Sequence, residues 1–129
     1  MSKGDFAFTK LIVGDLERSA SFYRDTFGLK EDRRIDAEVM GRKITEIIMV
    51  PAAPGAATLV LFAFHDQPEP AVGDSILGFA TSDIEALIER ALRAGGSVAQ
   101  TMQSMPEHGA KVGFIRDNEG HLIEVLERF

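Results

Sequence analysis

The sequence predicts an α+β fold in which one βαβββ unit is used twice. Two segments carry the repeat, Phe8–Leu16 (FTKLIVGDL) and Ile76–Ile84 (ILGFATSDI), which start at residues 8 and 76, an offset of 68. In each, an apolar run meets a small residue, then an aspartate, then an apolar residue that opens a helical pattern. Gly28 and Gly96 keep the same offset. Such a repeat predicts two similar halves about a pseudo-twofold axis, with the groove between them as the natural place for a ligand.

The first half is expected to span about residues 5–64 and to begin with a strand over 6–13, which is rich in aromatic and branched side chains. Asp15 stands where it can cap a helix, and Gly28 where it can end one. Between them, apolar residues recur at helical spacing, at Leu16, Ala20, Tyr23 and Phe27. Three extended stretches follow, at residues 30–37, 43–50 and 58–64. The first is charged enough for an edge strand, and a Pro/Gly loop separates the other two.

A polar, proline-bearing connector at residues 65–73 leads into the second half, expected at about 75–129. The pattern repeats there as a strand over 75–81, a cap at Ser82 or Asp83, and a helix that stops at Gly95-Gly96. Further strands are predicted at 97–101, 111–115 and 121–126. The irregular stretch 102–110 is predicted to be a loop that could serve as a lid over a pocket. Because neither half alone would bury a full core, residues 1–129 are expected to form one domain.

The composition favours a cytoplasmic globular protein with a small organic ligand. The net charge of −6 argues against a nucleic-acid partner, because phosphate binding needs clustered cations. No apolar run is long enough to span a membrane, and the first residues do not resemble a secretory signal. The absence of cysteine excludes disulfides, a thiolate nucleophile and a zinc site built from cysteines.

Two segments of the chain resemble the vicinal oxygen chelate superfamily, which includes glyoxalases, bleomycin-resistance-type binding proteins, fosfomycin-resistance enzymes and extradiol dioxygenases. Residues 9–23 (TKLIVGDLERSASFY), followed by Phe27-Gly28-Leu29, resemble its opening, and residues 114–125 (FIRDNEGHLIEV) are similar to its closing hairpin. The resemblance implies that the two βαβββ modules form an open, curled-sheet barrel around a cavity. It also implies paired modules, and therefore a homodimer with cavities shared between chains.

The resemblance further implies four metal-ligand positions on inward-facing strands. In this chain they fall on Phe8, Leu61, Ile76 and Glu124. Three of these side chains are hydrocarbon, and one carboxylate cannot hold a divalent ion by itself. We therefore expect no metal ion and no other cofactor.

Other residues do not restore the usual chemistry of that superfamily. The three histidines, His65, His108 and His121, have no metal-binding spacing and are expected at the surface. Members that handle glutathione place an arginine four residues after the first ligand, where this chain has Ile12. Glutathione is therefore not the expected substrate.

Alternation along the strands is expected to line the cavity with apolar side chains and two ionisable groups. The candidate substrate-binding residues are Phe8, Lys10, Leu61, Ile76 and Glu124. Glu124 has two interpretations. It is either a general base, whose pKa would rise among Phe8, Leu61 and Ile76, or an anchor paired with Lys10 or Arg116.

The strand patterns also predict orientations for two charged residues, Lys10 and Glu46. Lys10 could bind an anionic group or, with a lowered pKa, form a Schiff base, but it is expected to reach solvent near the end of its strand. Glu46 interrupts an otherwise apolar strand and is expected to face water.

The sequence thus predicts a metal-independent, glyoxalase-like protein that binds a small apolar or aromatic molecule, and it leaves open whether the protein is an enzyme. One alternative is an isomerase or lyase in which Glu124 moves a proton next to a carbonyl, with Lys10 as its electrostatic partner. The other is a non-catalytic binding or sequestration protein of the bleomycin-resistance type, for which an apolar cavity suffices. A weaker alternative is a metal-dependent glyoxalase with ligands outside the four positions.

Overall fold

The computed structural model describes residues 3–129, which fold as a βαβββ unit followed by a second one. The first half comprises β1 (Phe8–Ile12), α1 (Leu16–Phe27), β2 (Lys30–Val39), β3 (Arg42–Val50) and β4 (Thr58–Phe64). The second half comprises β5 (Ile76–Ala80), α2 (Ile84–Arg93), β6 (Ser97–Met105), the short 3₁₀ helix η1 (Pro106–His108), β7 (Ala110–Arg116) and β8 (Leu122–Arg128). The predicted α+β fold with duplicated modules is confirmed.

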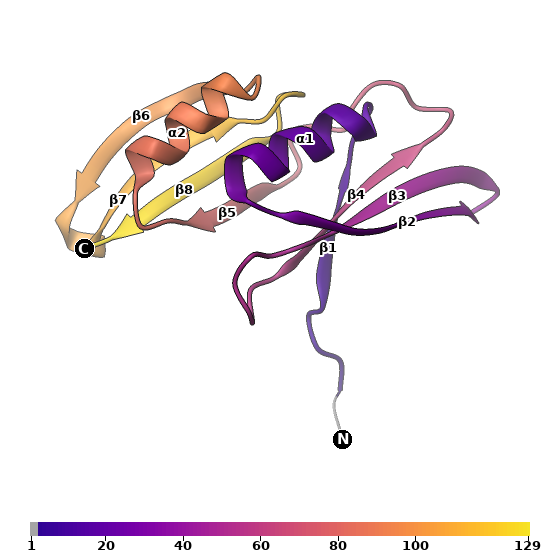
Figure 1. Cartoon of the computed structure of the whole chain (residues 1–129), viewed down its shortest axis with the longest axis horizontal. Helices are drawn as coiled ribbons and strands as arrows, with labels where there is room; N and C mark the ends of the chain where they lie inside the picture. The colour runs from indigo at the N-terminus through magenta and orange to yellow at the C-terminus, as the bar shows by residue number, and fades with distance from the viewer. Residues whose placement is uncertain (1–2) are drawn as a thin grey trace.

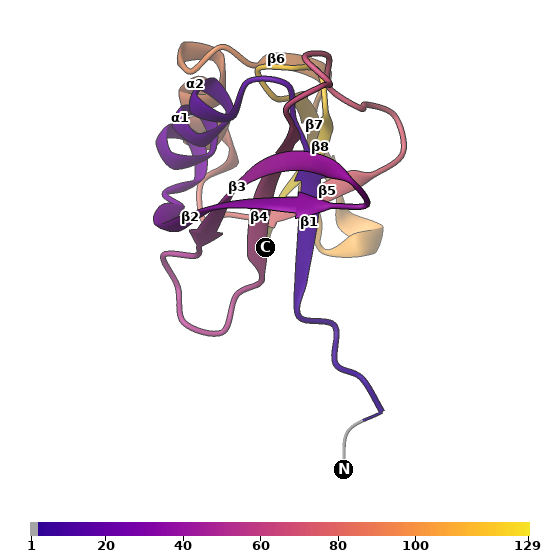
Figure 2. The ribbon, with the colours of Figure 1, turned by 90° about the vertical axis from the view of Figure 1, so that its right-hand side faces the viewer.

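Each half forms a mixed four-stranded sheet with the same topology, in the orders β1-β4-β3-β2 and β5-β8-β7-β6. β1 pairs parallel with β4, as β5 does with β8, and the remaining pairs are antiparallel. Figure 1 shows the two sheets extending away from each other, with α1 and α2 together on one side of them. The sheets curl without closing (Figure 2), and β2 is an edge strand as predicted.

Both helices begin where the repeat predicts. The side chains of Asp15 and Asp83 each accept a hydrogen bond from a backbone N–H three residues later, at 3.1 Å in both cases. Helix α1 ends at Gly28, whose φ of 71° lies in the left-handed region that glycine adopts without strain. Helix α2 ends earlier than predicted, at Ala94 rather than at the glycine pair.

The main core lies between the helices and the sheets. Phe22 and Tyr23 from α1, Ile84 from α2, and Leu61 and Ile123 from the sheets are almost completely buried there. The predicted core position of Tyr23 is therefore confirmed. None of the helices in the described part of the chain is long and apolar enough to cross a membrane.

The predicted lid over residues 102–110 is wrong. Met102–Met105 belong to β6, and η1 and Gly109 make only a short turn into β7. The pairing of β6 with β7 shifts register between Val98 and Gln100 and again between Gln100 and Gln103. These irregularities break the alternation of side chains that would have indicated a longer strand.

A buried polar cluster joins the two halves, and we call it the joint: Tyr23, Asp117, Glu119, His121 and the backbone of residues 12–15. The Tyr23 hydroxyl donates to Asp117 Oδ2 at 2.7 Å, and His121 Nδ1 lies 2.9 Å from the same oxygen. His121 Nε2 lies 2.9 Å from the carbonyl oxygen of Ile12. The predicted surface position of His121 is therefore wrong, because its ring is only 3% exposed.

The hydrogen bonds of the joint fix the charge of His121. A carbonyl oxygen only accepts, so Nε2 carries a proton, and Nδ1 meets a carboxylate and must also donate. Burial by itself disfavours the imidazolium, but the hydrogen bond and the charge of Asp117 outweigh it and raise the pKa of His121. Burial likewise opposes ionisation of Asp117, yet hydrogen bonds from His121 and Tyr23 lower its pKa. Burial and the neighbouring Asp117 carboxylate raise the pKa of Tyr23 well above its ordinary value.

The C-terminal hairpin also completes the start of α1. Both carboxylate oxygens of Glu119 accept from Gly14 N–H, at 2.9 and 3.1 Å, and one of them accepts from Asp15 N–H at 2.7 Å. This carboxylate satisfies backbone donors near a helix N-terminus, where negative charge is favourable.

Candidate functional site

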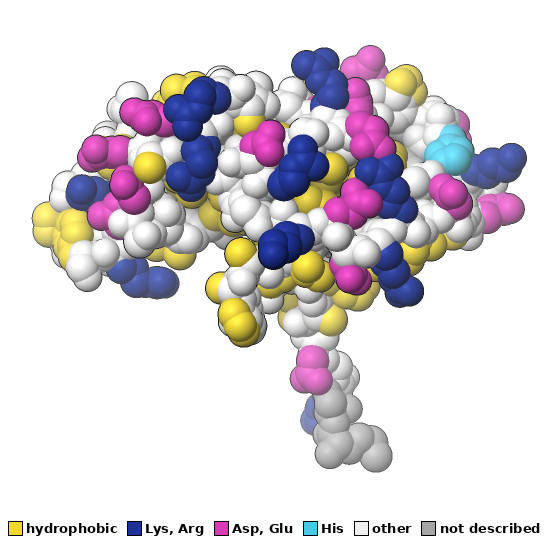
Figure 3. Space-filling model, in the orientation of Figure 1, with side chains coloured by type: hydrophobic (Ala, Val, Ile, Leu, Met, Phe, Trp, Pro, Cys, Tyr) yellow, Lys and Arg dark blue, Asp and Glu magenta, His cyan; other side chains and the backbone are white. Residues whose placement is uncertain are grey.

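Two hollows lie on the sheet faces that point away from the helices. Many charged side chains lie on the helical side (Figure 3). The first hollow, about 310 Å³, is lined by Ala7, Phe8, Lys10, Arg33, Ile35, Glu46, Ile48, Thr58 and Val60. The second hollow, about 400 Å³, is lined by Gln100, Gln103, Met105, His108, Ala110, Val112, Phe114, Glu124, Leu126 and Arg128. Each half of the chain thus contributes one open, partly polar surface.

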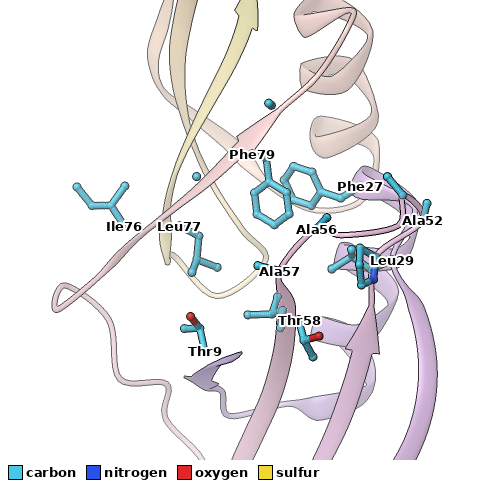
Figure 4. Close-up of a pocket in the computed structure, with 15 residues that line it drawn as sticks. Thr9, Phe27, Leu29, Ala52, Ala56, Ala57, Thr58, Ile76, Leu77 and Phe79 are labelled. Carbon is cyan, nitrogen blue, oxygen red and sulfur yellow. The ribbon is translucent and has the colours of Figure 1, made fainter. Parts of the chain in front are cut away.

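A third hollow is the predicted groove between the halves, with a volume of about 510 Å³ (Figure 4). Phe27 of α1 and Leu29, two residues further on, line it together with Leu77 and Phe79 of β5, and the loop at residues 51–57 contributes to its wall. The rings of Phe27 and Phe79 stack with centroids 3.7 Å apart. No charged side chain is among the residues that line the groove, so ionisable groups act on the two sheet faces instead.

Phe8 and Lys10 lie on the face of the first hollow, but Leu61 does not. Leu61 is fully buried on the helical side of the sheet, because the parallel register of β1 and β4 sets it beside Leu11 and sets Val60 beside Lys10. A shift of one residue along a strand moves a side chain to the opposite face. The cavity position predicted for Leu61 is therefore wrong, and Val60 takes its place on the face.

Ile76 and Glu124 lie on the face of the second sheet. Ile76 is 59% exposed, and half-buried Glu124 sits between Gly78 of β5 and Phe114 of β7. Of the three apolar neighbours predicted for Glu124, Phe8, Leu61 and Ile76, only Ile76 shares its sheet. Within residues 3–129 the Glu124 carboxylate makes no hydrogen bond or ion pair, so neither predicted pairing, with Lys10 or with Arg116, is present.

The carboxylate that Lys10 does meet is Glu46, a site residue that the sequence analysis missed. Lys10 Nζ lies 3.0 Å from Glu46 Oε2, and it also lies 5.0 Å from the ring centroid of Phe62 and 5.7 Å from that of Phe8. Glu46 is only 9% exposed, so its predicted orientation toward water is wrong. The pairing of β3 with β4 sets it beside Phe62 on the face of the first hollow. The sequence did contain a signal for this orientation. Glu46 alternates with Ile44 and Ile48, so all three side chains point to the same face of β3.

The ion pair leaves hydrogen-bonding capacity unused. Glu46 Oε2 is buried and accepts no well-aligned hydrogen bond from the described residues, although the ammonium group is close. The Lys10 side chain is 40% exposed, so at least part of its ammonium group can be reached from outside. The Lys10 ammonium group therefore offsets the charge of this oxygen, and its remaining N–H donors are available to a ligand.

The four positions that the resemblance assigns to a metal do not fit one. With Val60 in place of Leu61, they hold Phe8, Val60, Ile76 and Glu124, so a single carboxylate is the whole donor set. No group of three or more His, Asp or Glu side chains with metal-binding geometry occurs among residues 3–129.

The two remaining histidines lie apart from each other. His65 Nε2 lies 2.8 Å from the Thr45 hydroxyl at the surface of the first half, and His108 lines the second hollow. Both are exposed, as predicted.

Comparisons with known proteins agree with the fold. The family described as "Glyoxalase/Bleomycin resistance protein/Dioxygenase superfamily" matches residues 6–125. A lactoylglutathione lyase from Neisseria meningitidis is 27% identical over 122 residues, which cover 93% of this chain and 88% of that protein. A lactoylglutathione lyase from Arabidopsis thaliana is 24% identical over 119 residues, which cover 90% of this chain but only 41% of that protein. The chain thus spans about two fifths of the length of this plant relative.

Solved structures share the same architecture. A glyoxalase family protein from Bacillus cereus superposes with a TM-score of 0.81 at 20% identity, over 100% of this chain and 99% of that one. A glyoxylase/bleomycin resistance protein/dioxygenase domain from Frankia sp. gives a TM-score of 0.74 at 22% identity, over 99% and 100% of the two chains. Likeness at these identities reflects a common fold.

Proposed function

The chain belongs to the Glyoxalase/Bleomycin resistance protein/Dioxygenase superfamily, and on that premise we propose that it binds a small, largely apolar or aromatic organic molecule without a metal ion. The observation that carries this proposal is the chemistry of the two sheet faces. Hydrocarbon occupies three of the four family metal positions. The ionisable groups on these faces are Lys10, Arg33 and Glu46 in the first hollow and His108, Glu124 and Arg128 in the second. An apolar surface with few polar anchors is typical of small-molecule sites.

We further propose that residues 1–129 act as one domain and that two chains pair so that the first hollow of one chain faces the second hollow of the other. The exposure of Phe8 (50%) in the first hollow supports the pairing, and so does that of Ile76 (59%), which lies on the second sheet and lines the groove between the halves. Exposed apolar side chains at a site usually meet a ligand or a partner. A cavity closed in this way would bring Phe8, Lys10 and Glu46 near Ile76 and Glu124 of the other copy.

In such a cavity Glu124 is the candidate acid–base group of a metal-independent isomerase or lyase. Its carboxylate is free of partners within the described residues and lies beside the Phe114 ring, so it is available to take a proton next to a substrate carbonyl. The names of the lactoylglutathione lyase relatives favour lyase chemistry. The non-catalytic alternative, sequestration of an apolar molecule, needs the same cavity and no proton transfer.

The substitution Glu124→Gln distinguishes enzyme from binder. Small aromatic and oxo-acid compounds are first screened by thermal shift, because a ligand of the folded form raises the melting temperature. For a compound that binds, lost turnover with unchanged affinity supports catalysis by Glu124, whereas weaker affinity in a protein without turnover supports a binder. Glu89→Gln, an exposed change on α2, is the matched control.

Elemental analysis tests the metal-independent part of the proposal. We expect no stoichiometric transition metal in protein purified without chelators. One zinc or nickel ion per chain, retained through dialysis, would overturn it in favour of a metal-dependent glyoxalase with ligands outside the four positions.

A further inference from the structure

We propose that the first hollow binds a small aryl carboxylate, with Arg33 and Lys10 holding the carboxylate and the apolar wall holding the ring. The proposal names the ligand class for one side of the cavity described above, and it rests on the proposed function, the binding of a small organic molecule. The contact residues are Phe8, Lys10, Arg33, Glu46, Ile48 and Val60.

The charge of the hollow calls for an anion. Its lining holds two cations, Lys10 and Arg33, and one carboxylate, Glu46, which leaves a net charge of +1. Arg33 forms no ion pair within residues 3–129, in contrast to its neighbour Arg34, which pairs with Glu17 and Glu31 on the other face of β2. One ligand carboxylate would therefore neutralise the hollow and give Arg33 the partner it lacks. The planar guanidinium group presents two parallel N–H donors that match the two oxygens of a carboxylate.

Lys10 is a second cationic donor in the lining of the same hollow. Its ammonium group is fixed by Glu46 Oε2 at 3.0 Å and by the rings of Phe8 and Phe62. An ammonium group has three N–H donors, so contact with one carboxylate oxygen leaves others for a ligand.

The rest of the wall selects the body of the ligand. Half-exposed Phe8, together with Ile48 and Val60, presents apolar surface beside the two cations. At about 310 Å³ the hollow lies at the small end of ligand pockets, which suits a single ring. An inorganic anion would leave this apolar surface exposed to water, and a protonated amine would be repelled by the net positive charge. Both are therefore poorer ligands than an aryl carboxylate.

Calorimetric titration of the full chain with benzoate tests the proposal, with benzyl alcohol as a neutral probe of similar shape and benzylamine as a cationic one. We expect benzoate to bind at least about tenfold more tightly than either, because a charge-assisted hydrogen bond is lost in both other probes. Arg33→Gln should weaken benzoate binding about tenfold, and the adjacent Arg34→Gln should leave it unchanged. Glu46→Gln should strengthen it, since the net charge of the hollow rises.

Three results would overturn the proposal: no benzoate binding, equal affinity in Arg33→Gln, or a preference for benzylamine. Lys10→Met is a second test, but it leaves the buried Glu46 carboxylate without a cation and so also changes stability. The result for Arg33→Gln therefore decides the test, because Arg33 is exposed. Glu124→Gln separates this proposal from the proposed function. Benzoate affinity that depends on Arg33 and not on Glu124 supports the first hollow alone and contradicts the shared cavity, whereas the reverse pattern overturns the assignment made here.

Discussion

The joint between the halves and the first hollow both hold charged side chains against aromatic rings, but they satisfy them in different ways. In the joint, each side-chain oxygen and nitrogen of Tyr23, Asp117 and His121 has a partner within the protein. In the first hollow, Arg33 lacks an ion pair among the described residues, and the Lys10 ammonium group keeps N–H donors beyond its contact with Glu46. A saturated cluster has nothing left to offer a ligand, whereas an incomplete one does. We therefore expect the joint to stabilise the fold and the first hollow to bind a ligand.

Removing the central acceptor of the joint should have the largest effect. Asp117→Asn leaves the buried imidazolium of His121 without a counter-charge and disturbs the hydrogen bond of Tyr23. We expect the free energy of unfolding to fall by about 3–5 kcal/mol, the usual range when one partner of a buried pair is lost. Urea unfolding measures this loss of stability. The control is Asp66→Asn, which removes one partner of the exposed ion pair between Asp66 and Arg42. A loss below about 1 kcal/mol would mean that the joint is no more structural than a surface pair.

A steric change at the same place should have a smaller effect. A Cβ at Gly14 would lie 2.2 Å from the carbonyl oxygen of Pro68, so Gly14→Ala forces the backbone to move away from Glu119. We expect a loss of about 1–3 kcal/mol, as for other overpacked sites. Gly78→Ala on the second sheet is the matched control, because no atom lies within 4 Å of its Cβ position. Similar losses for both variants would contradict the tight fit.

The charge of His121 should appear as a pH dependence. Its folded pKa is raised, so its contribution to stability is complete below the unfolded value of about 6.5 and is lost as the pH rises through the folded value. The free energy of unfolding should therefore decline as the pH rises above about 6.5. His121→Gln should flatten that decline, and His65→Gln should not. An unchanged slope in His121→Gln would show that the imidazolium does not stabilise the joint.

Replacing the carboxylate of the first hollow by an amide, as Asp117→Asn does in the joint, should have the smallest effect on stability. Glu46→Gln removes the charge that faces Lys10, but that lysine is partly exposed and can turn to solvent. We expect a change in the free energy of unfolding within about 1 kcal/mol, well below that of Asp117→Asn. A loss as large as in the joint would remove the distinction between the two regions.

Local features of the fold could be predicted from the sequence, because they depend on residues a few positions apart. The caps at Asp15 and Asp83 and the strand at residues 58–64 required only neighbouring residues. The placement of Leu61 and Glu46 depends on which residues pair across strands, and alternation within one strand does not determine it. The burial of His121 depends on contacts with residues more than 90 positions away, and no local pattern signals them.

The carboxylate of Glu119 has a consequence for how the chain acquires its structure. It binds the backbone at the start of α1, across 105 positions of sequence. During synthesis the first module emerges from the ribosome long before this residue does, and until then the N–H groups of Gly14 and Asp15 have only water as a partner. The start of α1 is thus expected to remain frayed in the first module. The hairpin of β7 and β8 should stabilise it only after translation has passed residue 119.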